Sequence, residues 1–454
     1  MRPAVDRRPR GAPLSTPGLE VFPDTAEVSP AGHLVVGGCD VPTLASEHAT
    51  PLIVFDRATL ENRAAAFGRV VEPQHVVYAA KAFCCVAVCE ILRDLGLGLD
   101  VCTGGELATA LAAGFPPERM VFHGNNKSVD ELRMALDAGV GRVVADSFEE
   151  LRRLREVDWR NPVLIRVTPG VEAHTHEYVQ TGHEDSKFGF PLADGIALSA
   201  LRTASGLELD VAGLHAHIGS QIFEKEAFEL AASRLADLAG DARSELGLEV
   251  RELDLGGGLG IAYTPDDDPP DPGELAAAIV AVARKAFSAH GLALPAILFE
   301  PGRALAGPAG VTVYRVGTVK RIPRARGHAD QPDRVYVSVD GGLSDNPRYA
   351  LYGAKYEAAL ANRMGDPASL WCSIAGKHCE SGDILVRDVR LPEDVAPGDL
   401  LCIPATGAYT YSMASNYNRV PRPPVVLVEN GEAAVIVRRE TYDDVLRLDV
   451  PLST

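Results

Sequence analysis

Val101-Cys-Thr-Gly-Gly-Glu106 joins the end of an apolar run to the start of a helix that stops at Gly114. The unit returns as Met120–Gly139 and again from Arg142, with Ser128 and Ser147 in the place of Thr103. In each unit a hydroxyl side chain caps the helix, and a glutamate three residues later reaches back to the helix start. Glycines end the first two helices by adopting a left-handed conformation. The segment therefore predicts consecutive strand–helix units.

Eight short apolar runs between residues 76 and 300 fit this pattern, with helical stretches between them. They are Val76–Ala80, Leu97–Val101, Met120–His123, Arg142–Asp146, Pro162–Val167, Val211–His217, Leu253–Leu255 and Ala296–Phe299. Asp271-Pro-Gly-Glu274 is expected to open the last helix. Eight parallel strands with crossover helices predict an α/β fold, a (β/α)8 barrel of the TIM type. A doubly wound open sheet is the alternative that the pattern leaves open.

After Pro301 the pattern changes to short alternating runs between Gly, Pro and Asp turns. Runs such as Val311–Val319, Val335–Val339 and Ala434–Arg438 are typical of half-buried antiparallel strands, and residues 33–54 contain two similar runs. We therefore predict three parts of the chain. They are a disordered tail (1–18), a (β/α)8 barrel domain (56–305) and a second, mostly antiparallel β-barrel domain built from both chain ends (19–55 and 306–454).

The 454-residue chain carries 62 acidic and 44 basic residues, a net charge of −18. A protein this acidic has no basic field to hold nucleic acid or an anionic membrane surface. Its eight cysteines form no C-x-x-C pair, and no apolar run is long enough to span a membrane. The first residues lack the apolar core of a secretory signal. These features predict a cytoplasmic protein with reduced thiols.

Lys81 follows the run Val76–Ala80, so the first predicted barrel strand delivers an ammonium group to its carboxyl end. Functional groups of such barrels lie at these ends. A lysine there can bond covalently to a carbonyl group, although a paired structural lysine is the ordinary alternative. The other strand ends supply Asp100, His123, Arg166, His217, the Asp254–Gly258 loop and Glu300-Pro-Gly-Arg303.

One cofactor, pyridoxal 5′-phosphate (PLP), accounts for most of these groups. Its aldehyde needs an amine such as Lys81, and its phosphate needs backbone N–H groups such as those of Gly256-Gly257-Gly258. Glu300 can keep the pyridine nitrogen protonated, and His217 can lie flat against the ring. The glycine run matches no dinucleotide or ATP motif. A metal bound by His215 and His217 would lack a clear third ligand, so no metal site is predicted.

The second predicted domain carries further polar residues between glycines. Arg348, in Ser344-Asp-Asn-Pro-Arg348, can bind a carboxylate through two hydrogen bonds. In Gly376-Lys-His-Cys-Glu-Ser-Gly382, Cys379 lies between His378 and Glu380, where a basic neighbour favours proton transfer by the thiol. A surface arginine and a buried structural cysteine are the alternatives.

Nine motifs, in this order, closely resemble those of the fold type III PLP-dependent decarboxylases and, among them, the diaminopimelate decarboxylases. They are Tyr78–Phe83, Leu99–Glu106, His123–Lys127, Gly170–His176, Ser186–Gly189, His215–Gln221, Glu300–Arg303, Asp340–Asn346 and Gly376–Asp383. The resemblance runs from about residue 33 to the C-terminus. Phe83 and Val167-Thr-Pro169 depart from common family forms, and neither carries an assigned role.

The resemblance implies that Lys81 carries PLP, that His217 stacks on the ring and that Glu300 pairs with its nitrogen. It implies phosphate contacts from Ser220, Gly256, Gly257, Gly258, Pro301-Gly302-Arg303 and Tyr409. It implies substrate contacts from Arg303, Arg348, Tyr352, Glu380 and Tyr409. It further implies a homodimer in which Cys379 and Glu380 reach the site of the partner subunit, with Cys379 as the acid that returns a proton.

The activity that the resemblance implies is decarboxylation of meso-2,6-diaminopimelate to L-lysine and CO2. Three alternatives stay open on the sequence. One is a related decarboxylase acting on ornithine, arginine or a carrier-bound amino acid. The second is a racemase-like enzyme, which would set an arginine where this chain has Glu300. The third is a PLP-binding homologue without catalysis.

Overall fold

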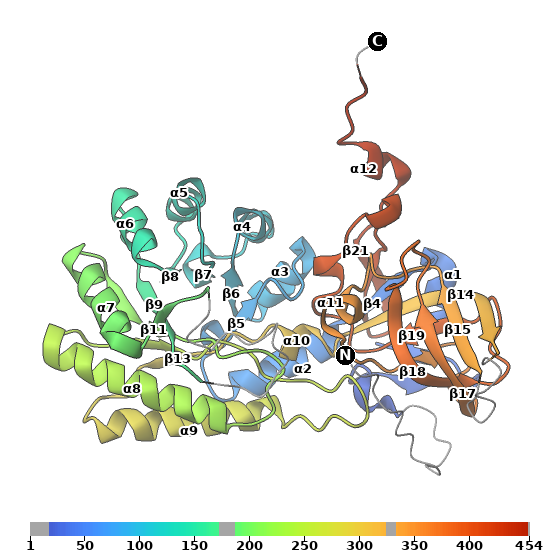
Figure 1. Ribbon diagram of the computed structural model, residues 1–454, viewed down its shortest axis with the longest axis horizontal. Helices are drawn as coiled ribbons and strands as arrows, with labels where there is room; N and C mark the ends of the chain where they lie inside the picture. The colour runs from blue at the N-terminus through green and yellow to red at the C-terminus, as the bar shows by residue number, and fades with distance from the viewer. Residues whose placement is uncertain (1–17, 172–186, 324–332, 453–454) are drawn as a thin grey trace.

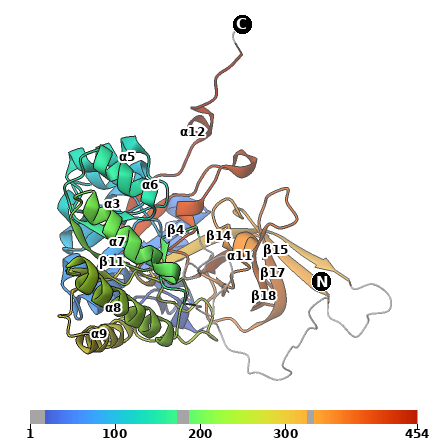
Figure 2. The ribbon, with the colours of Figure 1, turned by 60° about the vertical axis from the view of Figure 1, so that its left-hand side comes forward.

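The computed structural model describes residues 18–171, 187–323 and 333–452. The predicted N-terminal tail therefore lies outside the described residues, apart from Gly18. Two bodies lie side by side along the long axis of the molecule, a ring of parallel strands wrapped by helices and a second sheet (Figure 1). Figure 2 shows the same two bodies after a rotation of the view.

Eight parallel strands form the ring, in the sheet order β13-β12-β11-β9-β8-β7-β6-β5. They are β5 (Val77–Ala79), β6 (Gly98–Val101), β7 (Met120–Phe122), β8 (Arg142–Ala145), β9 (Val163–Thr168), β11 (Val211–His215), β12 (Glu252–Asp254) and β13 (Ala296–Leu298). A parallel bridge between Val76 and Phe299 joins the two ends of the sheet. The predicted (β/α)8 barrel is confirmed, and the open-sheet alternative is wrong.

Helices follow the strands and cover the outside of the ring (Figure 1). They are α2 (Arg57–Gly68), α3 (Val86–Asp94), α4 (Gly104–Ala112), α5 (Val129–Ala138), α6 (Phe148–Glu156), α7 (Ile196–Gly206), α8 (Glu226–Leu246), α9 (Pro272–Ala289) and the short α10 (Arg303–Ala306). A short strand, β10 (Phe190–Pro191), pairs with β9. Among the described residues, no helix is long and apolar enough to cross a membrane.

The helix caps differ from the prediction in one respect. Of the three predicted units, only the one with α5 has the full capping box, between Ser128 and Glu131. In the other two units the glutamate reaches one residue further back. Glu106 accepts the backbone N–H of Cys102 at 2.6 Å, and Glu150 accepts that of Asp146 at 2.9 Å. Each glutamate therefore ties the end of its strand to the helix that follows.

The barrel interior is organised in layers. Val77, Val121, Val144, Leu164, Ala212 and Leu298 form a buried cluster of their own, separate from the core under the helices. Because side chains alternate along a strand, the residue two positions further along most of these strands also points inward. Those residues include His123, Asp146, Arg166 and Glu300. An apolar layer thus lies beneath a polar layer at the carboxyl ends.

Strand β11 also has inward-pointing polar residues at its carboxyl end, but it contains a β-bulge. Val211 pairs with Val163, but Gly213 pairs with the next residue, Leu164, so β11 contains one extra residue. The extra residue reverses the alternation. The bulge therefore brings His215 and His217 to the inner side of the ring.

The second sheet has the order β18-β17-β15-β14-β4-β20-β21, with β19 pairing to β14 and β16. Its strands are β4 (Leu52–Asp56), β14 (Gly310–Ile322), β15 (Arg334–Val339), β16 (Ala359–Leu360), β17 (Ala368–Ala375), β18 (Ile384–Pro392), β19 (Leu400–Ile403), β20 (Val425–Glu429) and β21 (Glu432–Val437). The sheet is mostly antiparallel, as predicted. Two pairs are parallel, β4 with β20 and β15 with β17.

Two details of this region differ from the prediction. The run at residues 33–36 forms β2 (Leu34–Val36), which joins a separate three-stranded sheet with β1 (Glu27–Val28) and β3 (Cys39–Asp40). Strand β21 is mainly exposed rather than half-buried, because it is the last strand of its sheet. Three helices complete this region, α1 (Val41–His48), α11 (Arg348–Tyr352) and α12 (Tyr442–Leu446).

Gly213→Ala tests the bulge. A Cβ at this position would lie 1.8 Å from the backbone oxygen of Glu252, so we expect a loss of roughly 2–3 kcal/mol in stability and a lower thermal unfolding midpoint. Gly206→Ala is the matched control, because a Cβ there meets nothing within 4 Å. Equal midpoints for the two variants would contradict the assigned role of Gly213.

Candidate active site

Lys81 lies just beyond β5 and lines a cavity at the carboxyl ends of the strands. Burial opposes its charge, but attraction to the Asp100 carboxylate prevails, and the pKa of Lys81 is raised above its ordinary value. Asp100 is itself buried, which raises its pKa to about 6 against the opposing effects of His123 and Lys81. At neutral pH the pair is therefore an ammonium beside a carboxylate.

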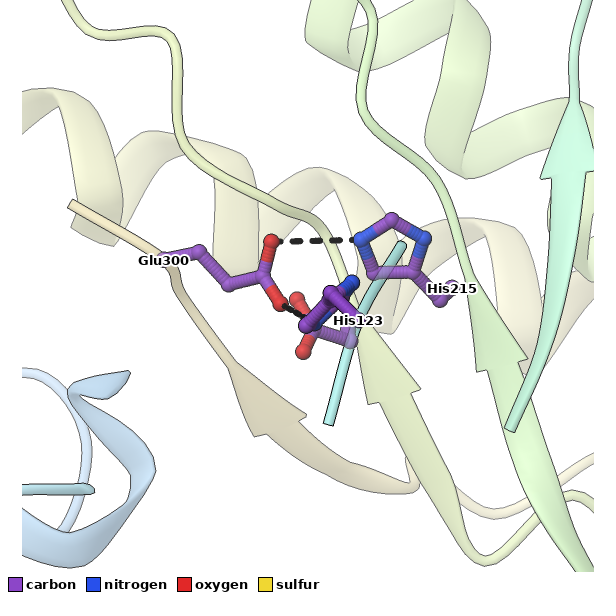
Figure 3. Close-up of side chains that lie close together, drawn as sticks. His123, His215 and Glu300 are labelled. Atoms are coloured by element: carbon purple, nitrogen blue, oxygen red, sulfur yellow. Dashed lines mark hydrogen bonds and ion pairs between the residues drawn. The ribbon is translucent and has the colours of Figure 1, made fainter. Parts of the chain in front are cut away.

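Glu300 is buried deep in the ring, and two histidines from other strand ends point at its carboxylate (Figure 3). Oε2 lies 3.2 Å from Nε2 of His215, and Oε1 contacts Nε2 of His123. Both imidazoles are almost fully buried. Burial disfavours the charge on Glu300, but the two histidines more than compensate, so the pKa of Glu300 is held well below its usual range.

Burial also shifts the pKa values of the two groups beside Glu300, Asp254 and His215. Burial and the nearby Glu300 raise the pKa of Asp254 well above its ordinary value, which favours its protonated form. Burial lowers the pKa of His215, and a neutral imidazole can still donate one N–H to Glu300. The cluster therefore holds one ionised carboxylate, Glu300, with donors already aimed at it.

Candidate metal-binding atoms of His123, His215, Asp254 and Glu300 all lie within 4.8 Å of one another. Sequence reasoning found no third partner for His215, because these residues come from four different strands. A hydrogen bond from His215 and an ion-pair contact with His123 account for the grouping of the two histidines with Glu300.

The cavity has a volume of about 490 Å³, which is within the usual size of a small-molecule site. Most of the predicted site residues line it, namely Lys81, His217, Ser220, Gly258, Glu300, Gly302, Arg303, Arg348, Tyr352 and Tyr409. The cavity therefore draws on both bodies, with Arg348 and Tyr352 coming from α11. Gly256, Gly257 and Pro301 are not among the lining residues.

The glycine run is required by the protein backbone itself. A Cβ on Gly257 would lie 2.1 Å from the carbonyl oxygen of Glu300, and one on Gly258 would lie 2.4 Å from that of Gly219. Gly256 and Gly258 also have positive φ angles. The backbone N–H of Gly257 donates to Nδ1 of His217 at 3.2 Å, so this loop orients the histidine beside the cavity.

Two arginines lie on the outer side of the cavity with tyrosine rings between them. Arg303 donates to Ser220 Oγ at 3.1 Å and to the hydroxyl of Tyr263. Its guanidinium carbon lies 4.8 Å from the centre of the Tyr409 ring, and that of Arg348 lies 5.2 Å from the Tyr263 ring. Nε of Arg348 is buried and has no hydrogen-bond partner among the described residues, so this arginine has a donor to spare.

Cys379 and Glu380 do not join the cavity of their own chain. Both are exposed on the turn between β17 and β18. The backbone N–H of Cys379 donates to Asn418 Oδ1 at 3.3 Å. The neighbouring His378 is buried and lies 2.9 Å from Ser344 Oγ. The turn is thus anchored while the side chains of Cys379 and Glu380 face solvent.

Sequence reasoning missed several residues that line the cavity, among them Gln221, Tyr263, Asp267, Lys355 and Met413. Tyr263 and Asp267 lie in the loop that follows β12, so their position at a strand end was the available signal. Lys355 and Met413 belong to loops of the second body that no motif marks. The predicted motif Gly170–His176 beyond Val171, and Ser186, lie outside the described residues.

Comparisons with known proteins agree with this geometry. A family model described as "pyridoxal-dependent decarboxylase, pyridoxal binding domain" matches residues 57–307. The chain is 49% identical over 444 residues to the diaminopimelate decarboxylase of Mycobacterium tuberculosis, covering 95% of this chain and 98% of that protein. It is 48% identical over 439 residues to the Bacillus subtilis protein of the same name, covering 95% and 98%.

A solved structure is similar as well. It is described as the diaminopimelate decarboxylase of M. jannaschii in complex with L-lysine. The TM-score is 0.86 at 32% sequence identity, and the match covers 94% of this chain and 98% of that one.

Asp100→Asn tests the pairing of Lys81. Only the neutral amine attacks an aldehyde, and loss of the Asp100 charge should lower the pKa of Lys81. We expect the pH midpoint for the rate of PLP attachment to the apoprotein to fall by about 1–3 units, followed by absorbance. Asp130→Asn, at a side chain that is 95% exposed, should leave the midpoint unchanged. An unshifted midpoint in Asp100→Asn would show that Asp100 does not control Lys81.

Proposed function

Because the chain belongs to the diaminopimelate decarboxylases of the pyridoxal-dependent decarboxylase family, we propose that it converts meso-2,6-diaminopimelate to L-lysine and CO2. This reaction is the last step of lysine biosynthesis by the diaminopimelate route. The observation that carries the proposal is a single cavity lined by Lys81, Glu300, Arg303 and Arg348. It combines an amine, a buried carboxylate and two fixed cations.

PLP fits the groups that are present. The cavity is large enough for the cofactor and an amino acid together. Lys81 is the amine that would hold the cofactor covalently, and the ionised carboxylate of Glu300 would accept a hydrogen bond from the N–H of a pyridinium ring. Ser220, Gly258, Gly302, Arg303 and Tyr409 are the groups that hold the phosphate. When bound, PLP supplies an electron sink for the pair of electrons released as CO2 leaves.

The role of Glu300 follows from its surroundings. Two imidazoles keep it ionised, so it favours a protonated ring nitrogen and a strong electron sink. An arginine at this position would weaken the sink and favour racemisation, the reaction of the racemase-like alternative. His217 lies beside Lys81 in the cavity lining and is the group we assign to the face of the ring.

Arg348 is the best candidate for the distal end of the substrate. Its guanidinium is buried among Tyr263, Tyr352 and Tyr409, and its Nε is unpaired within the described structure. A carboxylate would satisfy that donor, and the alternative substrates ornithine and arginine have none at the distal end. Arg303 already contacts Ser220, so we assign it chiefly to the phosphate, with Tyr352 and Tyr409 completing the substrate contacts.

The proton that replaces CO2 needs a donor, and we propose that Cys379 of the partner subunit supplies it. Cys379 and Glu380 are exposed on an anchored turn outside their own cavity. A homodimer in which each turn enters the cavity of the partner subunit would explain why these side chains are exposed and why they lie outside the cavity of their own chain. Glu380 of the partner subunit would then contact the amino group at the distal end of the substrate.

We propose that the two predicted domains supply different parts of the site. Residues 56–305 bind the cofactor, and residues 19–55 and 306–454 supply Arg348, Tyr352, Tyr409 and the turn with Cys379. We further propose that the protein works in the cytoplasm, a reducing compartment. All eight cysteines are free thiols, as that compartment requires.

A substrate panel tests the proposal. The protein, loaded with PLP, is incubated separately with meso-diaminopimelate, L-ornithine and L-arginine, and CO2 and the amine product are measured. We expect CO2 and L-lysine from diaminopimelate alone, because only that substrate offers Arg348 a distal carboxylate. Release of CO2 only from ornithine or arginine would overturn the substrate, and absence of CO2 from all three would overturn the reaction.

Lys81→Ala should lower turnover of diaminopimelate by at least about a thousandfold, because no other group would hold the cofactor at the carboxyl end of β5. Lys225→Ala is the control, since Lys225 is an exposed lysine on the surface near α8 that pairs with Glu229. Circular dichroism checks that both variants fold. Turnover near the wild-type rate in folded Lys81→Ala would contradict the assignment.

A further inference from the structure

The last described residues, 438–452, leave the second sheet after β21 and extend away from both bodies (Figures 1 and 2). We refer to this segment as the C-terminal arm. It contains the five-residue helix α12 and an extended stretch after it. None of its residues is buried.

Polar contacts tie the arm to the rest of the chain. Arg438 makes two hydrogen bonds to Asp444, at 2.5 and 2.6 Å, across the start of α12. Glu440 accepts the amide of Asn416 at 2.6 Å. Arg419 bonds to Asp449 at 2.6 Å. A helix of this length is not stable alone, so these contacts set the direction of the arm.

The apolar side chains of the arm face solvent. Tyr442 is 75% exposed, Leu446 53%, Leu448 81%, Val450 89% and Leu452 96%. Leu446 ends α12 and Leu448 lies in the turn after it, whereas Val450 and Leu452 lie two residues apart in the extended stretch and so point to the same side. Exposed apolar groups gathered in one segment mark an interaction surface.

The base of the arm is continuous with the turn that carries Cys379. Asn416 and Arg419, which hold the arm, flank Tyr417 and Asn418. Asn418 accepts the backbone N–H of Cys379, and the Tyr417 ring lies 5.4 Å from that of His378. A molecule that covers the turn at Cys379 therefore meets the base of the arm as well.

We propose that the C-terminal arm packs against a second copy of this chain, on the same side as the turn with Cys379. This inference rests on the proposed function, in which that turn enters the cavity of the partner subunit. In a twofold dimer each copy gives one arm and receives one. The arm thereby holds the turn of its own chain at the mouth of the other cavity.

The size of the arm suits this role. At roughly 60–120 Å² for each buried side chain of this kind, the five exposed apolar side chains named above would bury on the order of 600–1,200 Å² when both copies are counted. That is about half of the ~1,600 Å² of a stable interface. The turns with Cys379 and their surroundings would supply the rest.

Sedimentation equilibrium of the holoenzyme over a range of concentrations tests the proposal. The double variant Leu448→Asp, Val450→Asp should raise the dimer dissociation constant at least about a hundredfold, since it forces two charges into an apolar contact. Leu230→Asp is the control, because Leu230 is 44% exposed on α8, away from the arm. A monomeric wild type, an unchanged dissociation constant in the double variant, or equal weakening in the control would overturn it.

Hydrogen exchange of residues 442–452 separates a second copy from the arm's own chain as the surface that covers it. We expect slow exchange in the dimer and fast exchange in the monomer obtained by dilution. Equally slow exchange in the monomer would mean that the arm folds onto its own chain and would overturn the proposal. Both measurements are independent of the decarboxylation assay, so either proposal can fail while the other stands.

Discussion

The buried carboxylate of Glu300 is the group on which the site depends. Ionised in the interior, it would be very costly without donors, and His123 and His215 supply them from two other strands. The barrel must close before these three residues meet. Once they do, the pKa of Glu300 is lowered by the two histidines, and that of the buried Asp254 beside it is raised. Folding of the ring therefore places a buried anion at the carboxyl ends of the strands, where the proposed function needs one.

The position of these groups follows from the alternation of side chains along the strands. Apolar residues such as Val121 and Leu298 fill the lower layer of the barrel, and His123 and Glu300 follow two positions later on the same strands. Strand β11 needs an extra residue at the Gly213 bulge to bring His215 and His217 inward. The same strands therefore provide the apolar layer that packs the barrel interior and, two residues later, the polar groups at the carboxyl ends.

Much of this could be predicted from the sequence, because strand ends and helix caps are local features. The eight barrel strands and the group of Lys81, Glu300 and Arg303 follow from apolar runs and the residues after them. Contacts set by tertiary structure could not be predicted. The grouping of His123 with His215 depends on barrel closure, the position of Lys355 depends on how a loop without a motif folds, and the exposure of β21 depends on its place at the edge of the sheet. The position of Cys379 outside the cavity of its own chain agrees with what the family resemblance implied, although no local pattern in the sequence indicates it.

Among the described residues two lysines line the cavity, Lys81 and Lys355. We assign the cofactor to Lys81 alone because Asp100 and Glu300 act on its ammonium group. The most direct test is to load the protein with PLP, reduce the linkage with borohydride, digest the protein and locate the added mass by mass spectrometry. We expect the pyridoxyl group on the peptide that contains Lys81. Its recovery on Lys355, or on no lysine, would show that Lys81 does not hold the cofactor.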